Sequence, residues 1–227
     1  MAAQEMSPPA TRVAPRPELR RRQARAAATR TALLDAALRE FAAHGYEGAS
    51  TRAIATAAGT HQPQINYHFD SKEELWKAAV DHLFDRLDDA VARHLGETDP
   101  GWNSRAGFAA NVRAFVRAAA GLPELNRIMV QEATIDSERL QWIVECHTRP
   151  RFEVVTEQWR RLRDDGSVAD IDEVVLYYSL VGAASLAYVN APEARLLGHD
   201  TLTSTFIEAH ADALVTMFLG PAEAVTR

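Results

Sequence analysis

Amide-bearing side chains cluster around residue 65, and amides can recognise the edges of DNA bases. His61, Gln62, Gln64 and Asn66 surround Ile65, the residue that we expect to be buried. The side chain of Gln or Asn can make a bidentate contact with adenine, in which its amide nitrogen donates to N7 and its amide oxygen accepts from the N6 amino group. A short helix that buried Ile65 would present the polar side chains on its outer surface. The pattern therefore predicts a helix that recognises bases in the major groove of duplex DNA.

Groups suited to phosphate follow directly along the chain. Tyr67 carries a hydroxyl, His68 an imidazole and Lys72 an ammonium group. Each of these can contact the phosphates that position a protein on DNA. The next helix is expected to begin at Lys72, and a helix N-terminus favours anions. We therefore expect phosphate contacts beside the base contacts.

Two short helices must position these groups. Ser50 is a suitable N-cap for a first helix, which Gly59 ends. Thr60 or His61 can cap the second helix, and Pro63 is tolerated in its first turn. Two short helices joined by a glycine-containing turn form a helix-turn-helix, whose second helix enters the major groove while the first crosses the phosphate backbone.

A longer helix precedes this pair, from about Arg20 to His44. Leu34, Leu38 and Phe41 recur at helical spacing on one face. Gly45 follows where a left-handed C-terminal cap is expected. Residues 1–22, which are rich in proline and arginine, are predicted to form a flexible basic arm.

The remainder is also predicted to be helical, because no alternating strand pattern occurs. Pro150 should kink one long helix, since proline cannot complete the helical hydrogen-bond pattern. The sequence therefore predicts an all-α fold, with a three-helix domain at residues 23–70 and a second helical domain at residues 71–227. Expected helices in the second domain span residues 72–95, 106–120, 137–163, 170–190 and 200–219, with a further one opening at residue 123.

Charge is distributed unevenly along the chain. Residues 1–75 carry 10 Lys and Arg against 8 Asp and Glu, whereas residues 76–227 carry 15 against 23. A locally basic segment on an acidic body is typical of a DNA-binding module joined to a regulatory or assembly module. A solvated arginine tail that binds nothing is the alternative, and charge alone does not separate the two. The basic residues in question are Arg20, Arg21, Arg22, Arg25 and Arg30.

Composition limits the class of protein. Hydrophobic residues make up 47% and charged residues 25% of the 227 residues, which is typical of a globular chain. No apolar run reaches the roughly 18 residues that span a bilayer, and no secretory signal is recognised. Cys146 is the single cysteine, which excludes an intramolecular disulfide. We expect a cytoplasmic protein without a membrane partner.

The stretch from Leu33 to Leu75 resembles the DNA-binding domain of TetR/AcrR-type transcriptional regulators. Two positions depart from the family pattern: His61 stands where serine is frequent, and Asn66-Tyr67 replaces the frequent paired tyrosines. The landmarks that carry the resemblance are Ala36-Ala37, Phe41, Gly45-Tyr46, Ser50, Ile54-Ala55, Ala58-Gly59, Tyr67-His68-Phe69, Lys72 and Leu75.

The resemblance implies an Ω-shaped homodimer that binds a palindromic double-stranded DNA operator and is released by a small, largely apolar effector. The second domain would then serve ligand binding and dimerisation. The implied DNA-binding residues are Ser50, Thr51, Arg52, Thr60, His61, Gln62, Pro63, Gln64, Asn66, Tyr67, His68 and Lys72.

In such proteins the last two long helices form the dimer contacts, and the effector lies between the middle helices. Both sets of side chains could equally be ordinary core of one subunit. The implied dimer residues are Val174, Tyr178, Val181, Tyr188, Leu202, Phe206, Ala213 and Met217. The implied effector-binding residues are Phe108, Val112, Phe115, Met129, Glu132, Trp142, Cys146, His147, Phe152, Trp159 and Tyr177.

Other functions are weighed against this one. An activator, or an architectural DNA-binding dimer without an effector, uses the same features and remains open. An enzyme is not expected, because no nucleophile, zinc-protease, P-loop or dinucleotide motif is present. Glu132, Cys146 and His147 could offer metal ligands, but Cys146 and His147 lie about 100° apart around a helix and do not converge. We expect no metal and no cofactor.

Overall fold

The computed structural model describes residues 17–96 and 101–220, and these residues form helices with no strand. The predicted all-α fold is confirmed. None of the described helices combines the length and apolarity that crossing a bilayer would require. In chain order the helices are α1 (Pro17–Gly48), α2 (Thr51–Ala57), α3 (Gln62–His68), α4 (Lys72–Leu95), α5 (Arg105–Gly121), α6 (Pro123–Ala133), α7 (Glu138–Ile143), the π-helical turn η1 (Val144–Thr148), α8 (Arg149–Asp164), α9 (Glu173–Val189), α10 (Ala191–Leu196) and α11 (Ser204–Leu219).

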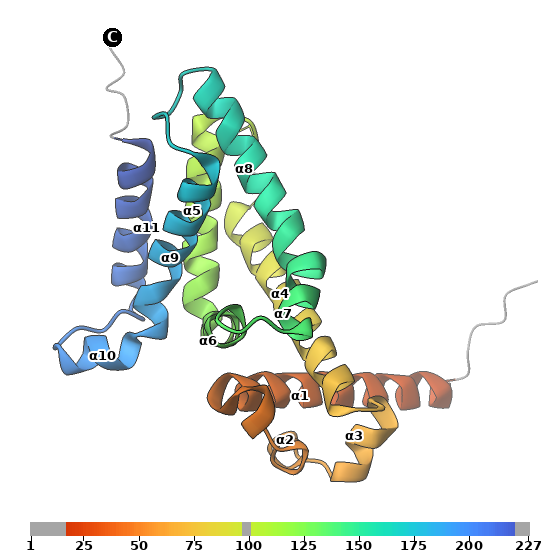
Figure 1. Ribbon diagram of the computed structural model, residues 1–227. Coiled ribbons are helices and arrows are strands. Elements are labelled where there is room, and N and C mark those ends of the chain that lie inside the picture. The colour runs from red at the N-terminus through yellow and green to blue at the C-terminus, as the bar shows by residue number, and fades with distance from the viewer. Residues whose placement is uncertain (1–16, 97–100, 221–227) are drawn as a thin grey trace, which may run out of the picture.

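Helices α1, α2 and α3 form the head of the molecule, and α4 to α11 form its body. In Figure 1, α2 and α3 lie on the side of α1 that faces away from the body. Gly45 has a φ of +69°, in agreement with the glycine cap predicted there, and α1 is kinked at this residue. Ile54 and Ile65, one from each short helix, are buried against α1 in a shared core. The head is therefore a helix-turn-helix held by a longer helix.

The long helix α4 connects the head to the body. It begins at Lys72, as predicted, because the Ser71 hydroxyl caps the N–H of Glu74 at 3.0 Å. Glu74 in turn accepts the N–H of Asp70 at 2.7 Å, which is close to a capping box. An apolar stripe runs along α4, and its members Leu75, Ala79, Leu83 and Leu87 are all buried.

A second core fills the body between α5, α8, α9 and α11. Phe108, Trp159 and Leu176 are buried there, and the Trp159 indole donates to the carbonyl of Ile171 at 2.9 Å. Figure 1 shows α5, α9 and α11 lying side by side, with α8 across from them. The two cores meet along α4 and α5, and the head packs on the body through contacts of α1 with α4 and α6.

Pro150 is accommodated by a π turn rather than by a simple kink in one helix. The predicted helix over 137–163 is divided into α7, η1 and α8. Proline has no N–H to donate to the carbonyl four residues earlier, and its ring crowds that carbonyl. The N–H of Arg149 bonds instead to the carbonyl of Val144, five residues earlier.

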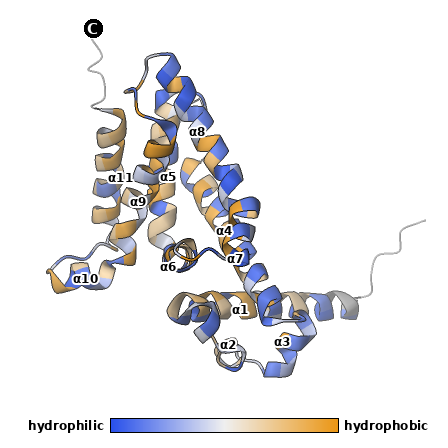
Figure 2. Ribbon diagram, viewed as in Figure 1, coloured by the Kyte–Doolittle hydropathy of each residue, from blue (hydrophilic) through white to orange (hydrophobic). Residues whose placement is uncertain are grey.

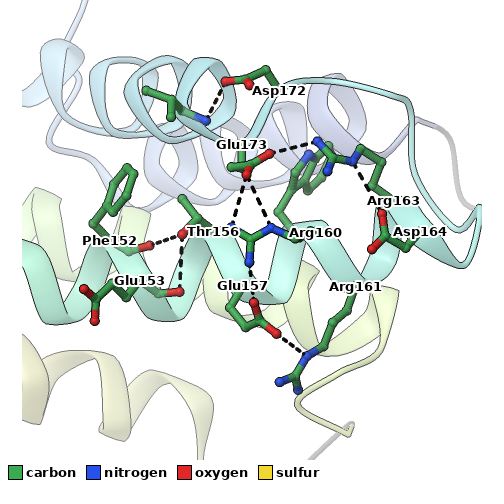
Figure 3. A network of polar contacts seen from close by, with 12 residues as sticks. Phe152, Glu153, Thr156, Glu157, Arg160, Arg161, Arg163, Asp164, Asp172 and Glu173 are labelled. Carbon is green, nitrogen blue, oxygen red and sulfur yellow. Dashed lines mark hydrogen bonds and ion pairs between the residues drawn. The ribbon is translucent and has the colours of Figure 1, made fainter.

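Ion pairs fasten α8 to α9 at the end of the body far from the head. The carboxylate of Glu173 accepts from Arg160 at 3.1 Å and from Arg163 at 2.9 Å (Figure 3). Hydrogen bonds from the first turn of α9 and from both arginines lower the pKa of Glu173 to about 2. Asp172 caps the same helix end by accepting two backbone N–H groups. Two helices that border the body core are thereby held in a fixed register.

Two boundaries differ from the prediction. α1 begins at Pro17, so residues 17–22 of the predicted flexible arm are helical, because Glu18 and the following arginines and alanines are good helix formers. Residues 1–16 of that arm lie outside the described residues. The last helix begins at Ser204 rather than at residue 200, and the short helix α10 between Ala191 and Leu196 was not expected.

Burial of histidines makes the stability of the fold depend on pH. The His147 ring stacks on Phe84 at 4.3 Å, and burial lowers its pKa below 6.5. The unfolded chain therefore binds the proton first, and stability is lost as the pH falls below about 6.5 toward the lower pKa of the folded state. We predict that His147→Phe weakens the dependence of the urea midpoint on pH between 7.5 and 5.5. The exposed His199→Gln is the control, and an unchanged slope in His147→Phe would contradict the prediction.

Candidate functional site

The short helix α3 buries one side chain and exposes its polar face. Ile65 is 3% exposed, whereas Gln62, Gln64 and Asn66 are exposed and Tyr67 is 71% exposed. These four outward side chains contribute little to the core of the head. Hydrophilic residues accordingly colour α3 in Figure 2. The structure brings the predicted amides and the tyrosine together on one solvent-facing helix.

Helix α2 braces α3 against α1. The hydroxyl of Ser50 caps the N–H of Ala53 at 3.3 Å, and the Ser50 N–H donates to Glu40 of α1 at 3.0 Å. Thr51 is half-buried, with its hydroxyl 3.5 Å from the Gln62 side-chain nitrogen. Arg52 is exposed and points away from this network. Ser50 and Thr51 therefore position the two helices, while Arg52 offers a free cation.

The side chains of the turn before α3 and of the last residue of α3 differ in how far they are exposed to solvent. His61 occupies the N-cap position without a side-chain capping bond and is exposed, as is Pro63 in the first turn. Thr60 is half-buried. His68 is also half-buried, with its ring 4.9 Å from that of Tyr67. His61 and Pro63 are therefore exposed together with the polar residues of α3, whereas His68 is half-buried at the end of the helix.

Lys72 has intramolecular partners that the sequence did not reveal. Its ammonium group donates to the carbonyl of Glu47 at 3.2 Å and lies 5.0 Å from the centre of the Tyr46 ring. Both partners are in the turn that ends α1. Lys72 therefore fastens the start of α4 to the end of α1, besides being close to the surface of α3.

A cavity of about 450 Å³ lies in the body, bordered by α4, α5, α8 and α9. Its volume falls in the range of sites for small molecules. Leu87 and Val91 of α4 form part of its wall, so the helix that ends in the head also borders this space. The other apolar residues of the wall are Trp102, Phe108, Val112, Phe115, Pro150, Val154, Val155, Tyr177, Leu180 and Val181.

Polar groups occupy one part of the wall. Arg151 of α8 donates to both carboxylate oxygens of Asp88 on α4, at 2.5 and 3.3 Å, and to the carbonyl of His147 at 2.8 Å. Gln158 donates to the carbonyl of Trp102. Burial raises the pKa of Tyr177, which stays protonated at neutral pH. The cavity is thus mainly apolar, with an ion pair bridging α4 and α8 at its edge.

The predicted effector-binding residues divide into two groups. Phe108, Val112, Phe115 and Tyr177 line the cavity. The others lie elsewhere among the described residues, because the π turn and the two cores direct their side chains away from it. Met129 and Trp142 pack on the first core, Trp159 lies within the second, Phe152 contacts the ring of Tyr177, Glu132 pairs with Arg139, His147 stacks on Phe84, and Cys146 is exposed.

Comparison with known proteins supports the interpretation of the head. Residues 33–79 match the family model described as bacterial regulatory proteins, tetR family. The repressor AcnR of Corynebacterium efficiens is 36% identical over 66 residues, which cover 29% of this chain and 35% of that protein. The repressor NicS of Pseudomonas putida is 33% identical over 73 residues, which cover 32% and 34%. The chain spans about a third of the length of the curated relatives it matches.

The head of this chain therefore resembles proteins of the tetR family. Solved structures extend the likeness in fold beyond the head. AibR in complex with isovaleryl coenzyme A and operator DNA has a TM-score of 0.64 and 21% identity, covering 86% of this chain and all (100%) of that one. The fatty acid degradation regulator FadR of Bacillus halodurans has a TM-score of 0.61 and 17% identity, covering 82% and 94%. The likeness in fold therefore includes the body as well as the head.

An exposed apolar face extends over α9 and α11. Tyr178 is 70% and Met217 76% exposed, and Val174 and Leu202 are also exposed. Ala213 lies on the same exposed side of α11. Figure 2 shows α11 as largely hydrophobic. Large apolar side chains on two neighbouring helices favour an interface with another protein surface.

Three predicted interface residues lie elsewhere. Tyr188 is 2% exposed, and its hydroxyl is 2.9 Å from His210 Nδ1, so it belongs to the core of its own subunit. Burial raises the pKa of Tyr188 to about 12. Val181 lines the cavity, and Phe206 is half-buried against the second core. α9 is apolar on nearly every side, so its sequence periodicity did not distinguish the outer face from the inner one.

Sequence reasoning also missed several residues of the site. Asp88 and Arg151 border the cavity, but they are 63 residues apart and carry no motif. Leu186 is 59% exposed on the outer face of α9, and Val175 is 58% exposed. A helical projection of residues 173–189 would have placed Val175 and Leu186 near Tyr178. No such projection would have placed Asp88 beside Arg151, because the two residues lie on different helices.

The contacts of Lys72 predict a loss of stability when it is replaced. Lys72→Ala removes the hydrogen bond to Glu47 and the contact with the Tyr46 ring, and should lower the unfolding free energy by about 1 kcal/mol. Lys77 is the other lysine of the chain and pairs with Glu73 at the surface. Lys77→Ala should cost less, because an exposed ion pair contributes little to stability. Equal urea midpoints for the two variants would contradict this role of Lys72.

Proposed function

We propose that this protein is a ligand-responsive transcriptional repressor that binds a palindromic operator as a dimer. The observation that carries the proposal is α3, whose amides at residues 62, 64 and 66 face solvent while Ile65 anchors the helix. Amides presented by the second helix of a helix-turn-helix suit contacts with base edges in the major groove. The relatives AcnR and NicS are both named transcriptional repressors, which favours repression over activation.

The proposed DNA surface joins α2, α3 and the start of α4. Base contacts are assigned to the exposed Gln62, Gln64 and Asn66. Phosphate contacts are assigned to Arg52, Tyr67 and their neighbours at the ends of the two helices, since phosphate contacts fix register and orientation. In domain terms, residues 23–70 would bind DNA and residues 71–227 would bind the effector and the second subunit.

The exposed face of α9 and α11 is the proposed dimer interface. A two-fold axis would pair this face with its own copy, forming an intersubunit bundle of four helices and an Ω-shaped molecule. Tyr178 and Met217 would be buried by that contact. Each subunit then presents one head, and a palindromic site has two matching half-sites about 34–36 Å apart or a multiple of that distance.

The effector is proposed to bind in the body cavity. Its wall is mainly apolar, which favours a small molecule that is largely apolar itself. AibR was crystallised with isovaleryl coenzyme A, which makes a short acyl thioester a suitable first compound to test. Because Leu87 and Val91 of α4 border the cavity, an effector there contacts the helix whose other end holds the head.

The DNA-binding role predicts a loss of base discrimination in a head variant. Duplexes selected by the protein from a randomised pool should bind with two chains per duplex in a fluorescence anisotropy titration. Gln64→Ala should cost about 1–3 kcal/mol and relax the preference at one base pair of each half-site. Gln141→Ala, the same substitution at an exposed body position, is the control. Failure of the wild type to enrich any sequence would refute the proposed function.

The effector role predicts that filling the cavity separates ligand response from DNA binding. A compound that raises the melting temperature and weakens operator affinity about 5- to 150-fold would be an effector. Isovaleryl coenzyme A heads the panel of acyl compounds and apolar metabolites. Val112→Phe should abolish both effects and leave operator affinity intact, whereas Val130→Phe on the surface of α6 should change neither. A compound that shifts melting without changing operator affinity would count against induction by that compound.

A further inference from the structure

Among the described residues, most arginines of the body are paired with carboxylates, whereas those of the head are not. Within the described residues, none of the head arginines at positions 21, 22, 25, 30, 39 and 52 contacts a carboxylate. The following arginines all form ion pairs: Arg86, Arg113, Arg117, Arg139, Arg149, Arg151, Arg160, Arg161 and Arg163. An unpaired guanidinium keeps its full charge available for an external anion, and no internal ion pair must be broken first.

Three of these unpaired arginines lie on a part of α1 that extends past the rest of the head. Arg30 contacts Phe69, with its guanidinium 5.2 Å from the ring centre. Arg22 lies eight residues nearer the N-terminus, which is about 12 Å further along the helix axis. Arg21, Arg22 and Arg25 are exposed. Figure 1 shows this part of α1 continuing beyond α3 and the start of α4.

The direction of these arginines follows from contacts further along the same helix. Glu40 accepts the N–H of Ser50 at the start of α2, so its side of α1 is the side of the short helices. Arg22 precedes Glu40 by about five turns at 3.6 residues per turn, and the two side chains leave α1 in the same direction. Asp35, which contacts His82 and Arg86 of α4, leaves α1 about 140° away from Arg22. By the same count Arg25 lies about 60° from Glu40, whereas Arg21 lies about 100° from Glu40 and about 40° from Asp35. Arg22 and Arg25, but not Arg21, therefore point toward the DNA-facing side of the head.

We propose that Arg22 and Arg25 bind the phosphate backbone of the duplex just outside the half-site that α3 contacts. This inference rests on the proposed function, because it takes the position of the DNA from α3. Duplex DNA presents one negative charge per roughly 1.7 Å of axis, so an extension of about 12 Å meets several phosphates. The contact would be independent of sequence, and it would lengthen the site that each subunit occupies.

Duplex length is the variable that tests this contact. A duplex selected by the wild type from a randomised pool is prepared in two forms, one ending at the half-site edges and one with scrambled flanks of about ten base pairs. The double variant Arg22→Ala, Arg25→Ala keeps α1 helical, because alanine is the best helix former, and circular dichroism verifies this. The matched control Arg149→Ala, Arg161→Ala removes the same charge from exposed positions of the body.

The wild type and the body control should bind the long duplex at least about tenfold more tightly than the short one at 100 mM salt. The head variant should bind the long and the short duplex equally tightly. Both affinities should equal that of the wild type for the short duplex. For the long duplex, the slope of log K against log salt concentration should become shallower by about 0.9 for each arginine engaged in each subunit.

A length effect that persists in the head variant would overturn the inference and leave the proposed function standing, because specific binding to the short duplex is measured in the same titration. If the wild type selects no sequence at all, the proposed function and this inference both fail.

Discussion

Burial of one face of α4 is the constraint on which the arrangement of the molecule depends. Leu75, Ala79 and Leu83 are buried in the core that holds the head, and Leu87 continues the same stripe into the cavity wall. A helix packed at both ends transmits displacement because its residues cannot move independently of one another. Capping by Ser71 and the contact of Lys72 with the end of α1 fix its first turn. The position of the head therefore depends on how the body packs around α4.

The Asp88–Arg151 ion pair adds an electrostatic contact to that packing. It joins α4 to α8 at the border of the cavity, and Arg151 also lies 4.7 Å from the Phe84 ring centre. Asp88 is exposed and Arg151 partly so, and an ion pair in contact with water contributes little free energy by itself. The ion pair and the apolar stripe thus hold α4 to α8 by different forces at neighbouring positions.

Local signals in the sequence were sufficient for the head and for the fold class. The N-cap at Ser50, the left-handed Gly45 and the start of α4 at Lys72 each depend on residues within one or two turns, so they could be predicted. The cavity could not, because it depends on which side of each helix meets its neighbours. Trp159 was assigned to the cavity but is core, and Tyr188 was assigned to an interface but is buried beside His210. The π turn at Val144–Thr148 changed the direction of Cys146, and the helical spacing of the sequence gives no sign of it.

The single buried anchor of α3 has a consequence for evolution. Ile65 is the one buried residue of this seven-residue helix, and the outward positions on both sides of it are exposed. Substitutions at exposed positions usually change stability by less than about 0.5 kcal/mol. A lineage could therefore exchange the outward side chains of α3 through near-neutral steps, and acquire a new target sequence while the architecture of the chain stays unaltered.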